Sequence, residues 1–239
     1  IPDCNPAFLV SEMLTNPATG MGFSAGWLDS LQQYSDYCLA AQMLMSPAFT
    51  AQKPGRDWIT DILDATNTDA CWTGEKLRLL PRYEQGLTSS LGTYTPNITP
   101  VANVTIDDLI DTGNPYPITV DRIDDEDIPN VYRAEYTDRS SSYNTDIVSV
   151  EDEASIVTSG ARADNQKSWL WFCRSDYAQW ALEQHKHFRR SVRNRYTFIL
   201  PFRFDMLEVG DLLTITYPLL NLYQWPVRVE SIESDETSS

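Results

Sequence analysis

The clearest alternation of apolar and polar positions lies between Asn194 and Thr216. From Tyr196 to Phe204 the apolar positions recur every second residue, which is the period of a strand with one buried face. Their side chains are Tyr196, Phe198, Leu200, Phe202 and Phe204. Leu207–Asp211 resembles a turn, and Leu212–Tyr217 alternates again. We therefore predict a hairpin across this turn, with Trp225–Ile232 as a third strand and a helix covering the sheet.

Apolar residues at spacings of three and four predict four helices. The first is favoured by Asn5 as an N-cap residue and by Pro6 at the first helical position, where its missing N–H costs nothing. In the last helix Ser175 is the expected cap. Its inward stripe comprises Tyr177, Ala181, Gln184, Phe188 and Val192. The predicted helices cover residues 5–16, about Ser24 or Ala25 to Leu44, Arg56–Ala65 and about Ser175–Ser191.

Shorter periodic runs predict a hairpin and further strands in the remaining chain. The expected elements are a hairpin over Ala70–Leu80, strands at Ile118–Ile123, Val131–Tyr136 and Ile147–Val150, an extended Lys167–Cys173, and a helical turn Ile106–Ile110 capped by Thr105. Residues 85–100 are rich in Gly, Ser, Thr and Pro and are the best candidate boundary. The sequence thus predicts an α+β fold. Residues 1–84 would form helices plus a β-hairpin, and residues 85–239 a β-rich, barrel-like domain with an antiparallel sheet covered by the helix near 175–191.

Composition narrows the classes of function. The 239 residues carry a net charge of −16, whereas a nucleic-acid binder gains affinity from Lys and Arg. No run approaches the roughly 20 apolar residues that a membrane span needs. The four cysteines are scattered without a CxxC pair, which argues against a disulfide framework or a zinc site and favours a reducing compartment. We expect no specific nucleic-acid binding and no membrane partner.

Catalytic and metal-binding patterns are weak. His185 and His187 are the only histidines, and at i and i+2 on a helix their rings point about 200° apart. The acidic run Asp121–Asp127 lacks the central Gly and distal Glu of an EF-hand loop. No GxSxG, GxxxxGK[ST] or GxGxxG occurs. We therefore expect no catalytic residue, no metal, no cofactor and no enzymatic activity.

One segment concentrates positive charge in an otherwise acidic chain. Its cations are Lys186, Arg189, Arg190, Arg193 and Arg195. They form a candidate interface with an acidic neighbour, which could be another copy of the protein. The alternative is that they are helix C-terminal cations favoured by the helix dipole.

Seven tryptophans leave a carbohydrate-binding role open, since indole rings stack on sugars. Trp58, Trp72 and Trp180 fall within helix or strand patterns, which indicates core packing. The pattern does not assign a core position to Trp169, Trp171 and Trp225.

The chain opens with NPAFLVSEMLTNP (5–17), followed by Gly20-Met21-Gly22. This segment resembles the NPA-x4-DLLTNPRYGLG opening of the tail-tip (baseplate) hub proteins of long-tailed phages, prophages and gene-transfer-agent particles. The matching segments that follow are 57–59 with 72–77, RAEYTDR (133–139) with Tyr143-Asn144, EDEASI (151–156), RNRYTF (193–198) and LEVGDLLT (207–214). Departures are Ser11-Glu12 for Tyr-Asp, Met21 for Leu, and Val209 for Pro.

The resemblance implies a non-enzymatic structural role. Such hubs join the tail tube to the tip apparatus, as rings of three copies whose barrel-like domains continue the lumen, so the expected partners are other tail proteins. The expected location is the virion tail tip, with the host cytoplasm during assembly. These proteins are often longer, and a first residue other than Met fits a piece of one. An acidic lumen would let DNA pass without binding. The alternative is a carbohydrate-binding or cell-wall-hydrolysing tail module.

Overall fold

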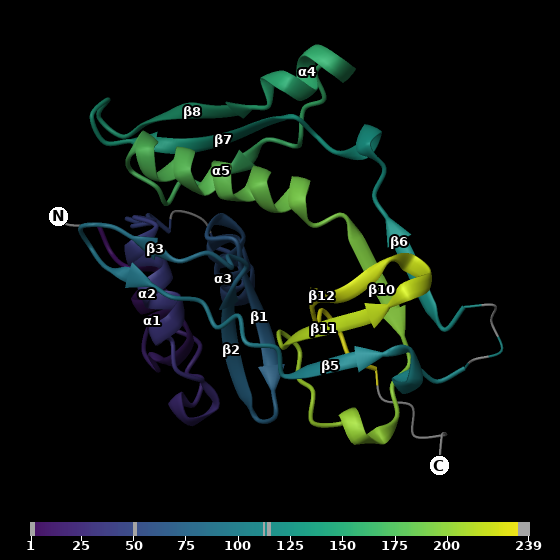
Figure 1. Ribbon diagram of the computed structural model, residues 1–239. Helices are drawn as coiled ribbons and strands as arrows, with labels where there is room; N and C mark the ends of the chain where they lie inside the picture. The colour runs from purple at the N-terminus through teal and green to yellow at the C-terminus, as the bar shows by residue number, and fades with distance from the viewer. Residues whose placement is uncertain (1–2, 50–51, 112, 114–115, 234–239) are drawn as a thin grey trace. The chain divides into compact units, whose positions relative to one another are not determined.

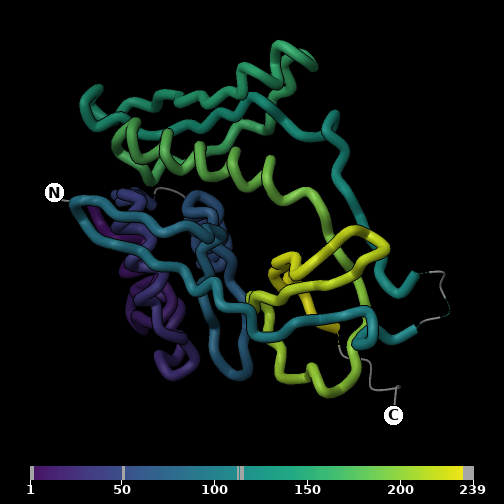
Figure 2. The backbone as a smooth tube through the Cα atoms, viewed as in Figure 1, coloured from purple at the N-terminus to yellow at the C-terminus, as the bar shows by residue number. Residues whose placement is uncertain are grey.

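The computed structural model describes residues 3–49, 52–111, 113 and 116–233, and the chain divides into two compact units (Figure 1). The first unit comprises Ile1–Ala70, Lys76–Pro96 and Ile123–Arg193. The second comprises Cys71–Glu75, Asn97–Arg122 and Asn194–Ser239. Both units are assembled from segments far apart in sequence, as the colours of the backbone trace show (Figure 2).

The first unit begins with helices α1 (Pro6–Thr15), α2 (Gln32–Ala40) and α3 (Gly55–Ala65). A hairpin of β1 (Thr68–Thr73) and β2 (Lys76–Pro81) follows, and then the short pair β3 (Leu87–Thr88) and β4 (Thr93–Tyr94). The turn end of the first hairpin, Cys71–Glu75, belongs to the second unit. The side chain of Asn5 caps α1 by accepting the N–H of Ala7 at 2.9 Å, as expected. Two of the predicted helices and the hairpin are confirmed within about two residues of their predicted ends.

The second helix is shorter than predicted. Only Ala25–Trp27 forms a 3₁₀ turn (η1) before α2 begins at Gln32. Between them Leu28 bridges to Leu77, and the N–H of Asp29 donates to the carbonyl of Leu77 at 2.9 Å. This pairing with β2 takes the backbone out of the helical path that the apolar spacing indicated.

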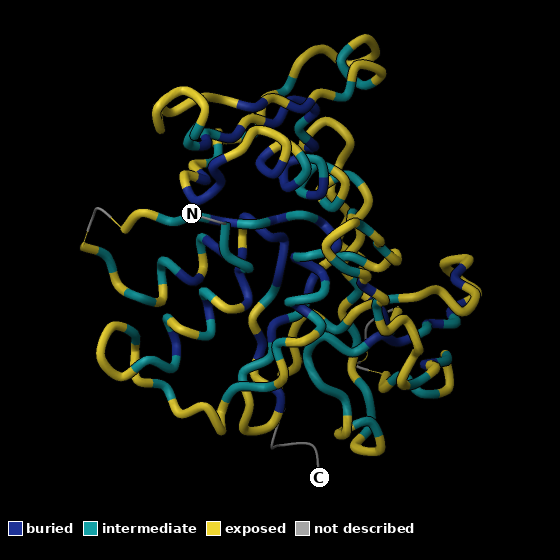
Figure 3. The backbone as a smooth tube through the Cα atoms, turned by 90° about the vertical axis from the view of Figure 1, so that its left-hand side faces the viewer, coloured by how far each residue is buried: buried dark blue, intermediate teal, exposed yellow. Residues whose placement is uncertain are grey.

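The rest of the first unit is a three-stranded sheet with one long helix. The strand order is β8-β7-β9, with β7 (Val131–Asp138) antiparallel to β8 (Asn144–Glu151) and parallel to β9 (Lys167–Ser168). The remaining elements are η3 (Asp125–Asp127), α4 (Glu153–Ser159) and α5 (Ser175–Ser191). Helix α5 packs on β7 and β8 (Figure 1), and it buries Ala178, Ala181 and Leu182. Figure 3 shows the buried parts of the backbone in dark blue.

Three details of α5 differ from the sequence prediction. Ser175 is the first helical residue, and the N-cap position belongs to Arg174, whose side chain makes no capping bond. Of the predicted inward stripe, Val192 is exposed, because it lies beyond the last turn. The helix covers β7 and β8 in the first unit, whereas the stretch from Asn194 belongs to the second unit.

The second unit contains two small sheets. The strand order of the first is β12-β11-β5, and the second pairs β10 with β6. The strands are β5 (Ala102–Thr105), β6 (Ile118–Arg122), β10 (Asn194–Phe198), β11 (Leu212–Tyr217) and β12 (Leu222–Arg228). Three 3₁₀ turns join them, namely η2 (Ile106–Asp108), η4 (Phe202–Phe204) and η5 (Pro218–Leu220). Thr105 and Asp108 form the capping box of η2, as expected of Thr105.

The predicted hairpin between Tyr196 and Tyr217 is wrong. Alternation holds only through β10, because Pro201 starts the turn η4 and leaves Phe202 86% exposed. The turn itself is present, with Gly210 at a φ of 93° that favours glycine. Each arm nevertheless pairs elsewhere, β10 with β6 and β11 with both β12 and β5.

Each unit has its own hydrophobic core. The second is centred on Val104, Ile118, Leu213, Ile215 and Tyr217. Among the described strands the sheets stay open, and two parallel pairs occur, β5 with β11 and β7 with β9. The fold is α+β, as predicted. None of the described sheets closes into the expected barrel.

A candidate interaction groove along helix α5

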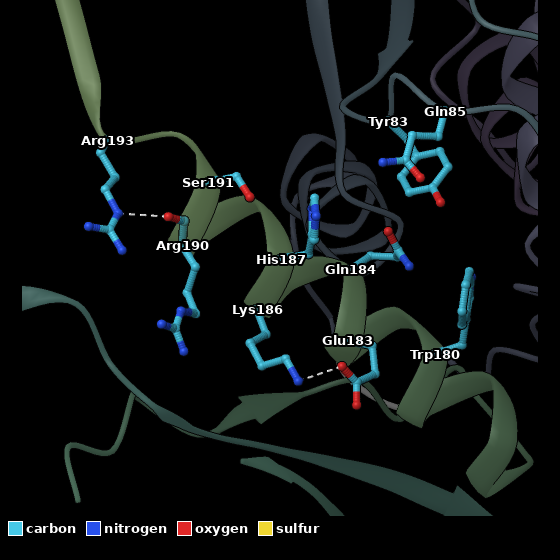
Figure 4. Close-up of a pocket in the computed structure, with 10 residues that line it drawn as sticks. All are labelled: Tyr83, Gln85, Trp180, Glu183, Gln184, Lys186, His187, Arg190, Ser191 and Arg193. Carbon is cyan, nitrogen blue, oxygen red and sulfur yellow. Dashed lines mark hydrogen bonds and ion pairs between the residues drawn. The ribbon is translucent and has the colours of Figure 1, made fainter. Parts of the chain in front are cut away.

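A groove of about 650 Å³ lies along the C-terminal half of α5 in the first unit (Figure 4). Its aromatic and amide walls are Tyr83, Trp180, Gln85 and Gln184. The charged and small polar residues that line it are Glu183, Lys186, His187, Arg190, Ser191 and Arg193. Three of the five predicted interface cations, Lys186, Arg190 and Arg193, therefore meet at one groove, because their positions follow one another around the end of one helix.

Two of these cations are paired on α5 itself or across to α4. Lys186 Nζ lies 2.6 Å from a carboxylate oxygen of Glu183, one turn earlier on the helix. Arg190 forms an ion pair with Asp152, the N-cap residue of α4. These pairs neutralise part of the positive charge that the sequence concentrates here.

The pairing continues beyond the end of the helix. Arg193 forms an ion pair with Asp125, and its Nε donates to the carbonyl of Arg190 at 2.8 Å (Figure 4). Arg195 lies in the second unit, where its guanidinium donates to both carboxylate oxygens of Glu230 at 2.9 and 2.8 Å. The structure thus does not place Arg195 in the groove.

Arg189 differs from the other four cations. Its side chain is exposed, and no ion pair joins it to a described residue. With Arg190 it occupies the last turn of α5, where the helix dipole favours positive charge. Arg189 is therefore the predicted interface residue whose charge is available to a neighbour.

The two histidines lie in different surroundings. His187 is exposed at the groove, whereas His185 is largely buried between the rings of Tyr132 and Trp169. Burial, assisted by Lys167, lowers the pKa of His185 below its usual 6.5, and the nearby Asp64 and Asp164 oppose this shift. No group of three or more His, Cys, Asp or Glu that could hold a metal occurs within the described ranges.

One buried donor at the groove, Nε1 of Trp180, has no hydrogen-bond acceptor among the described residues. A polar or negatively charged group that enters the groove can accept this N–H. The groove residues Tyr83 and Gln85 could not have been assigned from sequence, since they come from a connector about a hundred residues before α5.

Trp58 and Trp180 pack against the core of the first unit, as predicted, whereas Trp72 does not. Trp169 and Trp171 are buried, at 2% and 5% exposure. Trp72 is 55% exposed, because it occupies an outward position of β1. Trp27 and Trp225 are also exposed, at 54% and 51%.

A match to a protein-family model identifies the family of the chain. The model of the family described as "Putative phage tail protein" matches residues 54–232. The chain belongs to this family. A search of curated proteins finds no match.

Three solved structures are similar to this phage tail protein. A chain from the virion of a native gene transfer agent particle matches with a TM-score of 0.59 and 18% identity, over 97% of this chain and 53% of that one. Prophage tail protein gp18 from Listeria monocytogenes EGD-e gives 0.38 and 14%, over 77% and 48%. The tail protein from Neisseria meningitidis MC58 gives 0.45 and 9%, over 75% and 50%. Only the first TM-score supports a structural argument, and it shows that the fold is shared.

The chain spans about half the length of the structures that it matches. None of its described helices combines the length and apolar character required to cross a membrane. Family and fold therefore identify a tail protein, and its place within a tail is a matter for proposal.

Proposed function

We propose that this phage tail protein is a structural, non-enzymatic component of the tail tip, part of a baseplate hub that joins the tail tube to the tip apparatus. The family match over residues 54–232 carries this proposal. It is supported by the fold shared with a chain of a gene transfer agent virion and by the ordered motifs that resemble hub proteins. The protein would act in the virion tail tip after assembly in the host cytoplasm.

The assembled form would be a ring of three copies in contact with other tail proteins. With a net charge of −16, the wall of such a ring would repel DNA, so that DNA could pass without specific binding. Negative-stain images of the full-length protein should show three-fold rings. A stable monomer under conditions that assemble its neighbours would contradict the proposal.

The interface between copies would include the basic end of α5, with Lys186, Arg189, Arg190, Arg193 and Arg195. Arg190 and Arg193 already hold Asp152 and Asp125, so their reversal would disturb the monomer as well. Arg189→Glu is the cleaner variant, because it removes an exposed charge without breaking an ion pair to a described residue. We expect it to impair ring assembly at an unchanged melting temperature.

Lys76→Glu is the matched control, since it reverses an exposed charge at the β1–β2 turn. It should assemble normally. Equal assembly of both variants would remove α5 from the interface and leave the hub proposal standing.

Exposure of the indole rings of Trp27, Trp72 and Trp225 favours a second candidate, a carbohydrate-binding or cell-wall-hydrolysing tail module. Binding of the isolated chain to a glycan array that is lost in Trp72→Ala or Trp225→Ala would support it. Absence of glycan binding and of cell-wall hydrolysis would leave the structural role.

A further inference from the structure

The three-stranded sheet of the first unit ends in an eight-residue strand, β8. It is the terminal strand in the order β8-β7-β9, and α5 covers one face of the sheet (Figure 1). Val148 and Val150 face the helix and are buried, whereas Thr145, Ile147 and Ser149 are exposed. No described strand pairs with the outer edge of β8.

The hydrogen bonds of β7 show which groups of β8 face outward. On the far side of β7, the carbonyl of Glu135 accepts from Trp169 and the N–H of Thr137 donates to Phe172. Alternation then directs Ala134 and Tyr136 toward β8, where they stand opposite Val148 and Asp146. The N–H and C=O groups of the odd-numbered residues of β8 must therefore point away from the sheet. These residues are Thr145, Ile147, Ser149 and Glu151.

This edge lacks the usual protection. Edge strands are normally short, bulged, or interrupted by Pro or Lys, because a free row of N–H and C=O groups recruits other strands. β8 pairs with β7 through eight consecutive residues without a register shift, and it contains neither Pro nor Lys. By contrast, the edge strand β12 contains Pro226, a register shift against β11 and a positive φ of 48° at Gln224.

Among the described residues, the side chain of Asp146 occupies one outward N–H of the β8 edge, and an incoming strand can displace it. Oδ1 of Asp146 accepts the outward N–H of Ile147 at 2.8 Å, and Oδ2 accepts the hydroxyl of Tyr136 at 3.2 Å. An incoming carbonyl can replace Oδ1 at Ile147. The freed carboxylate oxygen is then available to a cation, while Tyr136 still holds the other oxygen.

Charge indicates what kind of strand would fit. β8 carries Asp146 and Glu151 and no cation, and Asp152 and Glu153 follow directly. Pairing of β8 with a second β8 would bring no opposite charges together. Lys or Arg on an incoming strand would face Asp146 on one face of the sheet or Glu151 on the other, because these two positions have opposite parity.

We propose that the edge of β8 binds an extended segment of a different protein, with basic side chains at alternate positions, as a fourth strand of the sheet. The backbone ladder would supply affinity and the carboxylates would select the partner. The inference rests on the geometry of the sheet and holds wherever in the tail the protein is located.

Amide hydrogen exchange followed by NMR tests this with the whole chain and synthetic peptides. The probe is an eight-residue peptide that alternates Val and Lys. At ten times its Kd it should slow exchange of the Thr145, Ile147 and Ser149 amides by about tenfold and leave the already bonded Val148 amide unchanged. A Val–Glu peptide, and a Val–Lys peptide N-methylated at every residue so that neither of its edges can donate, should have no effect.

Two variants distinguish the contribution of the Asp146 charge to peptide binding from the general attraction of a basic peptide to an acidic protein. Asp146→Asn keeps an oxygen that accepts the N–H of Ile147 and gains an amide N–H that the hydroxyl oxygen of Tyr136 can accept, but it removes the charge. It should weaken binding of the Val–Lys peptide several-fold. Glu75→Gln removes an exposed charge at the β1–β2 turn and should not weaken it.

Several outcomes would overturn the proposal. Equal effects of the N-methylated peptide would exclude strand addition, and equal effects of the Val–Glu peptide would exclude selection by charge. Protection that appears without peptide and grows with protein concentration would make a second copy the occupant. No protection of the three outward amides at peptide concentrations up to the solubility limit would mean that the edge is closed.

Discussion

At the scale of single residues, His185 brings several parts of the first unit together. Its ring lies between Tyr132 and Trp169, and its Nε2 is 3.4 Å from a carboxylate oxygen of Asp164. Lys167 and Asp64 also act on it electrostatically, with opposite effects on its pKa. Burial is the largest contribution, so the folded protein disfavours the charged imidazolium.

The consequence is a dependence of stability on pH. Because the folded pKa of His185 is lowered, the unfolded chain binds this proton first, and stability falls as the pH decreases below about 6.5. We expect the urea midpoint to decrease between pH 7.5 and 5.5, and His185→Gln to reduce that decrease. His187→Gln, at the exposed histidine, should behave as the wild type, and the same slope in all three proteins would contradict the assignment.

Replacement of Asp64 should lower the free energy of unfolding. It accepts Lys167 Nζ at 3.1 Å and the indole N–H of Trp169 at 3.3 Å, and it thereby joins α3 to β9. Asp64→Ala would leave the N–H of a tryptophan that is 2% exposed without its acceptor, at a cost of about 1–3 kcal/mol in the free energy of unfolding. Asp64→Asn retains an acceptor and should recover part of this loss in urea denaturation.

At the scale of elements, the start of α1 combines a local and a long-range bond. Asn5 Oδ1 accepts the N–H of Ala7, and its Nδ2 donates to Ser35 Oγ at 2.9 Å. Asn5→Ala should lower the free energy of unfolding by about 1 kcal/mol or more. Asn5→Asp keeps the cap and loses the donor to Ser35, so a loss equal to that of Asn5→Ala would show that the long-range bond matters more.

Elements were predictable where local signals agreed with the final pairing. The Asn5-Pro6 start of α1 follows from capping, and the extent of α5 follows from the spacing of its apolar residues, although its predicted cap was wrong. The false helix before α2 and the false hairpin after Asn194 share one cause. In both, a backbone segment pairs with a strand at least 48 residues away, Asp29 with Leu77 and β10 with β6, and no local pattern encodes such a partner.

The sequence predicted where the cations of the candidate site lie, but not all of their ion-pair partners. The basic run located the cations of the α5 groove, because neighbouring positions on one helix end must lie close together. It did not reveal that Arg190 and Arg193 are already paired, since their partners Asp152 and Asp125 are distant in sequence and are only two of thirty-four acidic residues.

At the scale of the whole molecule, the two separate cores predict two unfolding transitions. Ile215 is 1% exposed in the core of the second unit, and Ile215→Ala should cost that unit about 2–5 kcal/mol. Hydrogen exchange should accelerate in β5, β11 and β12, while β7 and α5 keep their protection. Leu182→Ala, in the core of the first unit, should give the reciprocal result.

A simultaneous loss of protection in both units would mean that they unfold as one cooperative body. Differential scanning calorimetry of the wild type provides an independent check, because two cores of unequal size should melt at different temperatures.

The parallel pairing of β5 with β11 also has a consequence for how the chain is made. Ala102–Thr105 is synthesised well before Leu212–Tyr217, and the segment Ile123–Arg193 of the first unit comes between them. At translation rates of about 5–20 residues per second, β5 waits on the order of 5–20 s for its neighbour in the sheet. The first unit can complete its sheet and helix during this interval, so the second unit is expected to fold after the first.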